Sequence, residues 1–468
     1  IESYTHGNIT LENILYLSAS NDVVFIDPYE ENIIDNKYNE YSQLLQSCNS
    51  HYELLCEKDS DRFFIPYGLQ KFNELMTSFL NANLTCNERK LVKFFECSQY
   101  FRMLPFKLKA GGNVRLIKDI FSHEDDSLLF GGDSKRRLVF VDSEVFIHFI
   151  HDIDSYFKNK NIEAKIISVE CSEAGKDLET LMFVLQNTER FNLLRRNEPI
   201  IAIGGGVLLD IIGFAASIFR RGVPYIKVPT TLLGMIDASV GAKTSINHFG
   251  RRNRLGSYYP AIQTIIDKRF LQTLKINEIC FALGEIIKMA VIKDAELFSI
   301  LEDNIDACIM DKFLNDKSDI IIETSINDML DELEPNLWEK DLKRCVDFGH
   351  SFSPLLEMNS LEDSSVYSLS HGEAVVLDVL FSCAIAKHRN LMSEEDLGRV
   401  VAMCDKCHLK THHPYFDDSL MLWDSLLDTT RHRDGHQNLP IPVGIGEHAF
   451  INDLTLCEIK SVIAGMKI

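Results

Sequence analysis

The sequence predicts an α/β domain with a parallel, Rossmann-like sheet, followed by an α-helical domain and preceded by an extra, mainly helical N-terminal segment. Short β-branched runs alternate with helix-length amphipathic segments over residues 137–203, which is typical of βαβ units. After about residue 268, helical periodicity replaces the strands. Residues 111–136 are rich in Gly, Asp, Ser and Lys and look like a linker, although they could also hold an ordered strand. We therefore expect domains at residues 1–110, 111–268 and 269–468.

The N-terminal segment carries one strand signal, residues 23–26, which ends on Asp27. Together with Asn8 and Asn13, Asp27 resembles the catalytic loop and metal-binding Asp of aminoglycoside-phosphotransferase-type kinases. Asn8 stands where those kinases have their catalytic Asp, and this sequence has no ATP-binding lobe. We expect an inactive fragment that buttresses the rest. The alternative is a functional part of a longer kinase fusion, since the sequence opens within the motif.

The sheet is expected to contain strands at residues 137–142, 164–169 and 199–203. The third strand runs into three glycines, residues 204–206, at the start of a helix. Glycine there lets backbone amides approach a pyrophosphate, and the helix N-terminus supplies positive potential. Because the pattern is not GxGxxG, an ordinary structural turn is an equal alternative.

Residues 220–260 concentrate Arg, Lys and Asn on segments that we expect to be loops between apolar strands. A dense set of cations and amides beside a dinucleotide turn indicates a second anionic ligand, most simply a phosphorylated substrate. The alternative is a solvated loop with salt bridges, because lysine and arginine are usually surface residues.

Candidate metal ligands occur in three separate segments of the helical half, at Glu285, His350 and His371. One carboxylate and two imidazoles would leave coordination positions open for substrate oxygens, as a catalytic zinc requires. Histidines so far apart in the sequence are more often surface or core residues than metal ligands, and their spacing alone does not decide between these interpretations. Lys288 lies one helical turn beyond Glu285, on the same face of the expected helix 281–301.

The composition is that of a packed globular protein: 46% of the 468 residues are hydrophobic and 25% are charged. A formal net charge of −21 disfavours nucleic acid and anionic membranes as partners. The 12 cysteines are scattered and no signal peptide is visible, which favours reduced thiols in the cytoplasm. Cys404, Cys407 and His408 spell the CxxCH haem motif, but the motif falls at a helix end and we expect two buried thiols instead.

Taken together, these motifs resemble the sugar phosphate cyclases of the dehydroquinate synthase superfamily over about residues 112–468. The resemblance implies a homodimer with an NAD-binding α/β domain, a helical metal domain and an active site between them. It assigns Glu285, His350 and His371 as ligands of Zn²⁺ or Co²⁺. The residues expected around NAD are Asp142, Glu173, Lys176, Gly204, Gly205, Gly206, Asp210, Thr230 and Thr231. The residues expected at the substrate are Asp237, Lys243, Asn253, Lys288 and Asp347, with Arg221 of the neighbouring subunit on its phosphate.

The substrate is expected to be a seven-carbon sugar phosphate, cyclised after transient oxidation by NAD and loss of phosphate. Dehydroquinate synthases usually have Asn at the place of Asp347 and a second His at the place of Pro354. An Asp accepts hydrogen bonds from hydroxyls and repels a carboxylate. The resemblance therefore favours sedoheptulose 7-phosphate as substrate and 2-epi-5-epi-valiolone as product.

Several alternatives stay open at this point. Within the family they are desmethyl-4-deoxygadusol synthase and 3-dehydroquinate synthase activity, although Glu373 after His371 favours the valiolone branch. Asp347 could instead be a partner of His350 that does not decide the substrate. From other classes, an NAD- and metal-dependent polyol dehydrogenase and an inactive scaffold remain possible.

Overall fold

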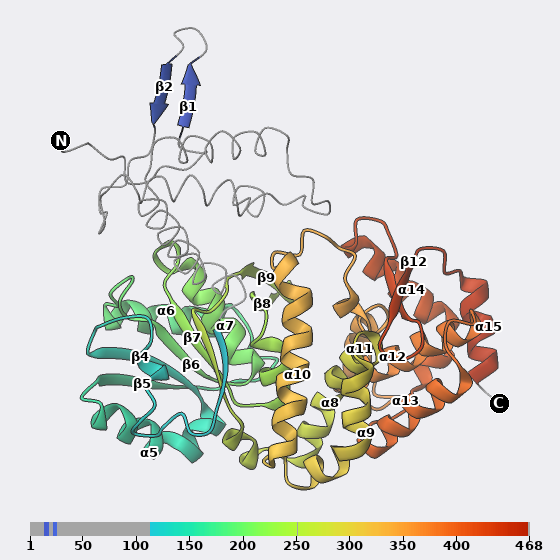
Figure 1. Cartoon of the computed structure of the whole chain (residues 1–468), viewed down its shortest axis with the longest axis horizontal. Helices are drawn as coiled ribbons and strands as arrows, with labels where there is room; N and C mark the ends of the chain where they lie inside the picture. Colours follow the sequence, from blue (N-terminus) through green and yellow to red (C-terminus); the bar gives the residue numbers. More distant parts are fainter. Residues whose placement is uncertain (1–13, 18–21, 26–112, 250, 467–468) are drawn as a thin grey trace, which may run out of the picture. The chain divides into compact units, whose positions relative to one another are not determined.

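The computed structural model describes residues 14–17, 22–25, 113–249 and 251–466 (Figure 1). Contacts divide the chain into two units, 1–108 and 109–468. In the first unit, β1 (Ile14–Leu17) and β2 (Asp22–Phe25) form an antiparallel pair. The expected strand is therefore present, and the sequence analysis missed β1. The kinase-like positions Asn8, Asn13 and Asp27 lie outside the described residues.

The second unit contains the expected parallel sheet. It has six strands in the order β3-β10-β7-β6-β4-β5, and every neighbouring pair is parallel. The strands are β3 (Asn113–Ile117), β4 (Arg136–Asp142), β5 (Glu163–Val169), β6 (Ile200–Gly204), β7 (Tyr225–Pro229) and β10 (Gln263–Asp267). Strands β6, β7 and β10 are buried along their whole length, as expected for a sheet covered on both faces.

For the segment at residues 111–136, the alternative of an ordered strand is confirmed and the linker is not, because residues 113–117 form β3 at the edge of the sheet. The buried guanidinium of Arg137 donates hydrogen bonds to the backbone oxygens of Leu128, Leu129, Gly132 and Ser134. These bonds fix the segment that follows β3 against the sheet. The sequence analysis judged this segment from its composition, which carries no information about such a long-range anchor.

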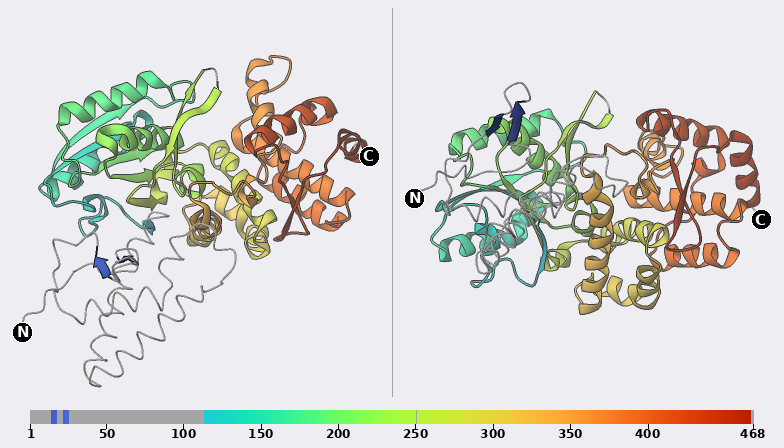
Figure 2. Two further views of the ribbon diagram at one scale, coloured as in Figure 1. Left: turned by 90° about the horizontal axis from the view of Figure 1, so that it is seen from above. Right: turned by 45° about the horizontal axis from the view of Figure 1, so that its top comes forward.

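Helices cover both faces of the sheet. On β4, Val139 and Val141 belong to the core shared with α5 (Ser143–Asn159). Leu138 and Phe140 point to the other face and pack with α6 (Leu178–Phe191) and α7 (Gly206–Ile218). The cation-rich residues 243–258 form a hairpin, β8 (Lys243–His248) and β9 (Arg251–Tyr258), and not the expected loops. In both views of Figure 2 this yellow-green hairpin lies at the border with the helical region.

The remainder of the chain is mainly helical. Its helices are α8 (Ile276–Ile292), α9 (Ala295–Met310), α10 (Asp316–Leu333), α11 (Ser353–Glu362), α12 (His371–His388), α13 (Glu394–Lys406), α14 (Ser419–His432) and α15 (Leu456–Met466). Two expectations were wrong. The single helix 281–301 is divided, because the Asp294 side chain accepts hydrogen bonds from the first amides of α9. Strands also recur after residue 268, in the pair β11 (Leu439–Pro442) and β12 (His448–Ile451).

Two smaller expectations are tested by the same region. Cys404 and Cys407 are buried free thiols at the end of α13, as expected, and burial raises the pKa of both. Among the described helices, none combines the length and hydropathy needed to cross a lipid bilayer. The boundary between the sheet region and the helical region at residues 268 and 269 stays a prediction.

Helices α8 and α12 touch through their backbones at two glycines. A Cβ atom added to Gly372 would lie 1.7 Å from the carbonyl oxygen of Phe281, and one added to Gly284 would lie 2.5 Å from the carbonyl oxygen of Gly372. Real Cβ atoms do not approach other atoms so closely, so both positions require glycine. Each glycine is adjacent to a candidate metal ligand, Glu285 on α8 and His371 on α12. The backbone contact therefore brings these two side chains together.

We predict that Gly372→Ala separates α8 from α12 and lowers the free energy of unfolding by about 1–3 kcal/mol, the usual cost of overpacking. Gly398→Ala on α13 is the matched control, because outside its own turn of helix no described atom lies within 4 Å of the added methyl. This control should gain about 0.5–1 kcal/mol, since alanine is the better helix former. Urea denaturation of both variants measures the difference, and equal effects would contradict the proposed helix contact.

Candidate active site

The carboxyl ends of β4 and β6 form the first part of the site. The chain passes from β5 across β4 to β6, so the direction of winding changes between β4 and β6, where α/β sheets bind their ligands. Asp142 ends β4 and accepts a hydrogen bond from the amide of Glu144 (3.0 Å), which caps α5. A Cβ on Gly204 would lie 3.0 Å from Cβ of Asp142. Glycine is thus required at the end of β6, because a side chain there would collide with Asp142 and Leu208.

The other two glycines contact the loop that follows β7. A Cβ on Gly205 would lie 3.3 Å from Cγ2 of Thr231, and a Cβ on Gly206 would lie 3.2 Å from Cβ of Ala238. The amide of Thr230 donates to the carbonyl oxygen of Gly204 (3.1 Å). The residues expected to hold a dinucleotide therefore meet at the N-terminus of α7, where free amides suit a pyrophosphate.

Four further residues singled out from the sequence are linked by polar contacts near this turn. The ammonium of Lys176 lies 2.5 Å from Oδ2 of Asp210 and 2.6 Å from Oδ1 of Asn253. Asn247 donates to Oε1 of Glu173 (2.9 Å) and, through its own oxygen, accepts from the amide of Asn253 (2.9 Å). Burial raises the pKa of Asp210, and the charge of Lys176 opposes the shift. The structure thus places Asn253, expected at the substrate, beside Lys176 and Asp210.

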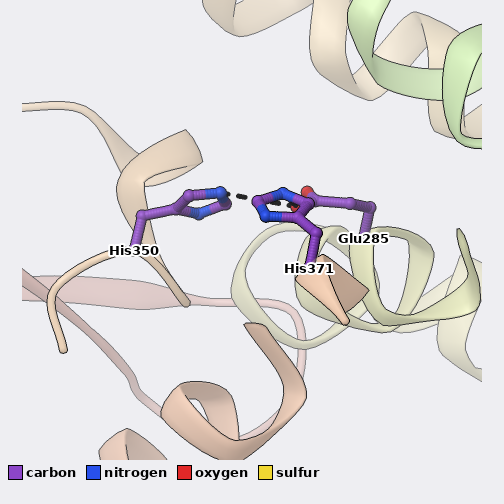
Figure 3. A group of neighbouring side chains, drawn as sticks. All are labelled: Glu285, His350 and His371. Atoms are coloured by element: carbon purple, nitrogen blue, oxygen red, sulfur yellow. Dashed lines mark ion pairs between the residues drawn. The ribbon is translucent and has the colours of Figure 1, made fainter. Parts of the chain in front are cut away.

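The three candidate metal ligands converge, as Figure 3 shows. Oε1 of Glu285 lies 3.4 Å from Nε2 of His350 and 3.3 Å from Nε2 of His371. One ligand atom from each residue falls within 4.8 Å of the others, and this is the only such group among the residues that the structure describes. The Glu285 side chain is buried, and neither of its oxygens accepts a well-formed hydrogen bond from a described residue. One buried carboxylate and two imidazoles are a donor set that fits Zn²⁺ or Co²⁺.

Charge is unevenly divided within this group. Burial alone would raise the pKa of Glu285, but the charges of Lys288 and the two histidines hold it well below its ordinary value. Desolvation lowers the pKa of His350 to about 4. Desolvation also opposes a charge on His371, yet its contacts with Glu285 and Glu357 raise the pKa of His371 to about 10. Glu285 is therefore an anion and His350 a neutral imidazole at pH 7, the states that a divalent ion requires, whereas His371 carries an extra proton that a bound ion would have to displace.

Lys288 and Asp237 connect this group to the glycine turn. The ammonium of Lys288 lies 2.5 Å from Oε2 of Glu285, on the same helix face as the sequence predicts. Asp237 lies on a short π-helical turn (Gly234–Ala238), directly before Ala238, which contacts Gly206. Burial and the nearby charge of Glu285 raise the pKa of Asp237. The dinucleotide turn and the metal ligands are thus neighbours in space.

A lysine that the sequence analysis did not single out binds the backbone of the loop that carries Asp237. Lys227 of β7 is buried, and its ammonium donates to the carbonyl oxygens of Ala238 (3.3 Å) and Gly241 (3.0 Å). Burial lowers the pKa of Lys227 to about 8. A lysine inside an apolar strand is unusual, and this was the signal in the sequence that could have revealed it.

Buried acids that the sequence analysis also missed hold the two histidines. Oε2 of Glu357 lies 3.2 Å from Nδ1 of His371. The Asp378 carboxylate accepts hydrogen bonds from the amides of Ser351, Phe352 and Ser353, which follow His350. The start of α12 is fixed by a capping box between Ser370 and Glu373. A charged residue within an apolar helical run was the available signal for Glu357 and Asp378.

Asp347 is held by two arginines. Its carboxylate lies 2.6 Å from Arg344 and 3.4 Å from Arg433. Burial would raise the pKa of Asp347, but the two guanidinium groups keep it below its ordinary value. The side chain therefore does not pair with His350, which answers one of the alternatives drawn from the sequence. Arg344 also contacts Glu339, whose carboxylate lies 2.5 Å from the ammonium of Lys243.

Arg221 stands apart from these groups. It is exposed, has a positive φ of 61°, and forms no hydrogen bond or ion pair with any described residue. The expectation that it serves a neighbouring subunit stays a prediction.

Comparisons with known proteins agree with this arrangement. Residues 166–280 match the family model of the 3-dehydroquinate synthase N-terminal domain, and residues 282–431 match that of the C-terminal domain. A 2-epi-5-epi-valiolone synthase of Streptomyces albus is 43% identical over 75% of this chain and 86% of its own length. A demethyl-4-deoxygadusol synthase of Trichormus variabilis is 34% identical over 71% of this chain and 81% of its own length.

Among solved structures, a similar one is ValA, the 2-epi-5-epi-valiolone synthase of Streptomyces hygroscopicus subsp. jinggangensis 5008, with NAD⁺ and Zn²⁺ bound. It is 38% identical, has a TM-score of 0.71, and aligns with 76% of this chain and 96% of its own length.

We predict that His350→Ala abolishes tight binding of Zn²⁺, because two protein ligands remain where a catalytic zinc site has three. Equilibrium dialysis against Zn²⁺, with metal analysis of the protein, measures the loss. His151→Ala is the control, since His151 is exposed on α5 and its side chain forms no hydrogen bond with the described residues. Undiminished zinc in His350→Ala would remove His350 from the ligand set.

Proposed function

The chain belongs to the 3-dehydroquinate synthase family, and from this membership we propose that it converts sedoheptulose 7-phosphate into 2-epi-5-epi-valiolone with release of phosphate. The observation that carries the proposal is the convergence of Glu285, His350 and His371 beside Asp237, next to the glycine turn of a parallel sheet. The identity of 39–43% with four 2-epi-5-epi-valiolone synthases supports this choice of substrate within the family.

The cofactors that we propose are NAD⁺ and Zn²⁺, with Co²⁺ as an alternative ion. The glycine turn at Gly204–Gly206 would hold the pyrophosphate, and Glu285, His350 and His371 would hold the metal. When bound, NAD⁺ accepts and returns a hydride, and the ion acts as a Lewis acid toward substrate oxygens. A structure in which ValA holds both NAD⁺ and Zn²⁺ supports the pairing.

The protein's own residues would bind and orient the sugar phosphate. We propose that Lys288 and Lys243 supply positive charge near the phosphate, together with Arg221 of a second subunit. The ammonium groups of Lys288 and Lys243 each lie 2.5 Å from a carboxylate, so they are held in place before substrate arrives. Asp237 and Asn253 would contact the hydroxyl groups. The homodimer and a cytoplasmic location are part of this proposal.

Asp347 would distinguish a polyol from a carboxylated substrate, but not through free negative charge. Arg344 and Arg433 neutralise the carboxylate and fix its orientation. A fixed carboxylate accepts hydrogen bonds from hydroxyl groups, and both arginines already contact the carboxylate of Asp347. The preference for sedoheptulose 7-phosphate would thus rest on the arginines as much as on Asp347.

The activity is tested by incubating the protein with sedoheptulose 7-phosphate, NAD⁺ and Zn²⁺. We expect phosphate release and a carbocyclic product, detected by mass spectrometry, without accumulation of NADH. Accumulation of NADH with a simple polyol would indicate a dehydrogenase instead. Turnover of the carboxylated substrate of dehydroquinate synthase would contradict the proposed substrate.

We predict that Asp347→Asn lowers kcat/KM for sedoheptulose 7-phosphate by about 10- to 100-fold, the value of a hydrogen bond to a charged group. The same change frees Arg344 and Arg433 and should raise the affinity for the carboxylated substrate. Inhibition constants and steady-state rates with both compounds measure the shift. Asp303→Asn removes the same charge from an exposed position of α9 and should change neither value; an unchanged ratio in Asp347→Asn would refute the role of Asp347.

A further inference from the structure

A guanidinium group links the sheet region to a metal ligand. Arg252 of β9 pairs with Oε1 of Glu357 on α11. The other oxygen of Glu357 lies 3.2 Å from Nδ1 of His371, whose Nε2 lies 3.3 Å from Glu285. Glu357 is buried, with 6% of the residue exposed. Its two oxygens are thus divided between an arginine of the hairpin and a histidine of the metal group.

The same arginine also faces the proposed dinucleotide side. Nε of Arg252 lies 3.6 Å from Oε1 of Glu173, the oxygen that accepts a hydrogen bond from Asn247. Glu173 is one of the residues that the family resemblance places around NAD. Arg252 is therefore shared between two carboxylates, one on the side of each proposed ligand. A ligand that engages Glu173 would leave Arg252 to Glu357 alone.

The contact with Glu357 affects metal binding because it determines which ring nitrogen of His371 carries the proton. Once His371 has lost one proton, a carboxylate that accepts the remaining proton of Nδ1 leaves Nε2 with a free lone pair for a metal ion and makes it a stronger ligand. Arg252 stabilises the buried charge of Glu357 and fixes the position of its oxygens. Although burial disfavours that charge, the contacts with His371 and Arg252 hold the pKa of Glu357 below its ordinary value.

We propose that NAD⁺ binding and divalent metal binding strengthen each other through Arg252, a positioning residue that acts on His371 by way of Glu357. The inference rests on the proposed function only for the identity of the two ligands and needs no substrate turnover. Coupling between two sites is reciprocal, so the factor by which NAD⁺ tightens the metal equals the factor by which the metal tightens NAD⁺.

The experiment is a titration of metal-stripped protein with Co²⁺, followed by the visible absorption of the bound ion, with and without saturating NAD⁺. In the native chain we expect NAD⁺ to tighten Co²⁺ by about 5-fold or more, within the usual range of such couplings. In Arg252→Met we expect this ratio to fall to about 1, and the affinity without NAD⁺ to fall by about 10-fold or more, as when an outer partner of a metal ligand is lost.

Arg254→Met is the matched control. Arg254 lies two residues further along β9 and is exposed, and its side chain forms no hydrogen bond or ion pair with the residues described in the structure. Removing its charge should leave the NAD⁺ effect on Co²⁺ at the native value. A comparable loss of coupling in this variant would mean that the general charge of the hairpin is responsible, which would overturn the specific role of Arg252.

Arg252→Lys tests the same idea should the methionine variant fail to fold. Lysine keeps the charge but lacks the planar fork that can contact two carboxylates at once, so we expect a ratio between the native value and 1. A native chain without any effect of NAD⁺ on Co²⁺, or a native ratio in both Arg252 variants, would overturn the proposal. Because no sugar phosphate is present, loss of coupling is distinguishable from absence of the cyclase reaction.

Discussion

A buried carboxylate, that of Glu285, is the interaction on which the site depends. A carboxylate removed from water must be balanced by nearby positive charge or by a metal ion. Here Lys288 lies 2.5 Å from one oxygen, and two imidazoles face the other. The arrangement is possible because Gly284 and Gly372 let α8 and α12 touch through their backbones. The close packing of α8 and α12 thus buries the Glu285 carboxylate, and the buried carboxylate in turn requires a cation beside it.

Much of the fold could be predicted from local patterns. Strands β4, β5 and β6 of the parallel sheet and the glycine turn between β6 and α7 were visible in the sequence, since β-branched runs and glycines report on the backbone directly. The β8–β9 hairpin was not, because charged side chains obscure the alternation of its apolar residues. The division between α8 and α9 depends on a single cap, Asp294.

The metal ligands could be named from the sequence only through a family resemblance. Glu285, His350 and His371 are far apart in the chain, and their meeting depends on the backbone contact between two helices, which no local pattern encodes. The residues that contact these ligands were harder still to predict from the sequence. Glu357 is one acid among many in the sequence, and its position between Arg252 and His371 is a property of tertiary structure alone. Asp347 was noticed, but its two arginines were not.

The β8–β9 hairpin contacts the helical region at two separate points, through Lys243 to Glu339 and through Arg252 to Glu357. A segment tied to two distant parts of the chain cannot change freely, because each substitution in it must suit both partners. A chimera that receives this hairpin from another member of the family will need the matching α11 and the residues after α10 from the same donor. The segments that must be transferred together are therefore separate in the sequence, and the ion pairs between them, not the domain boundaries, determine which segments they are.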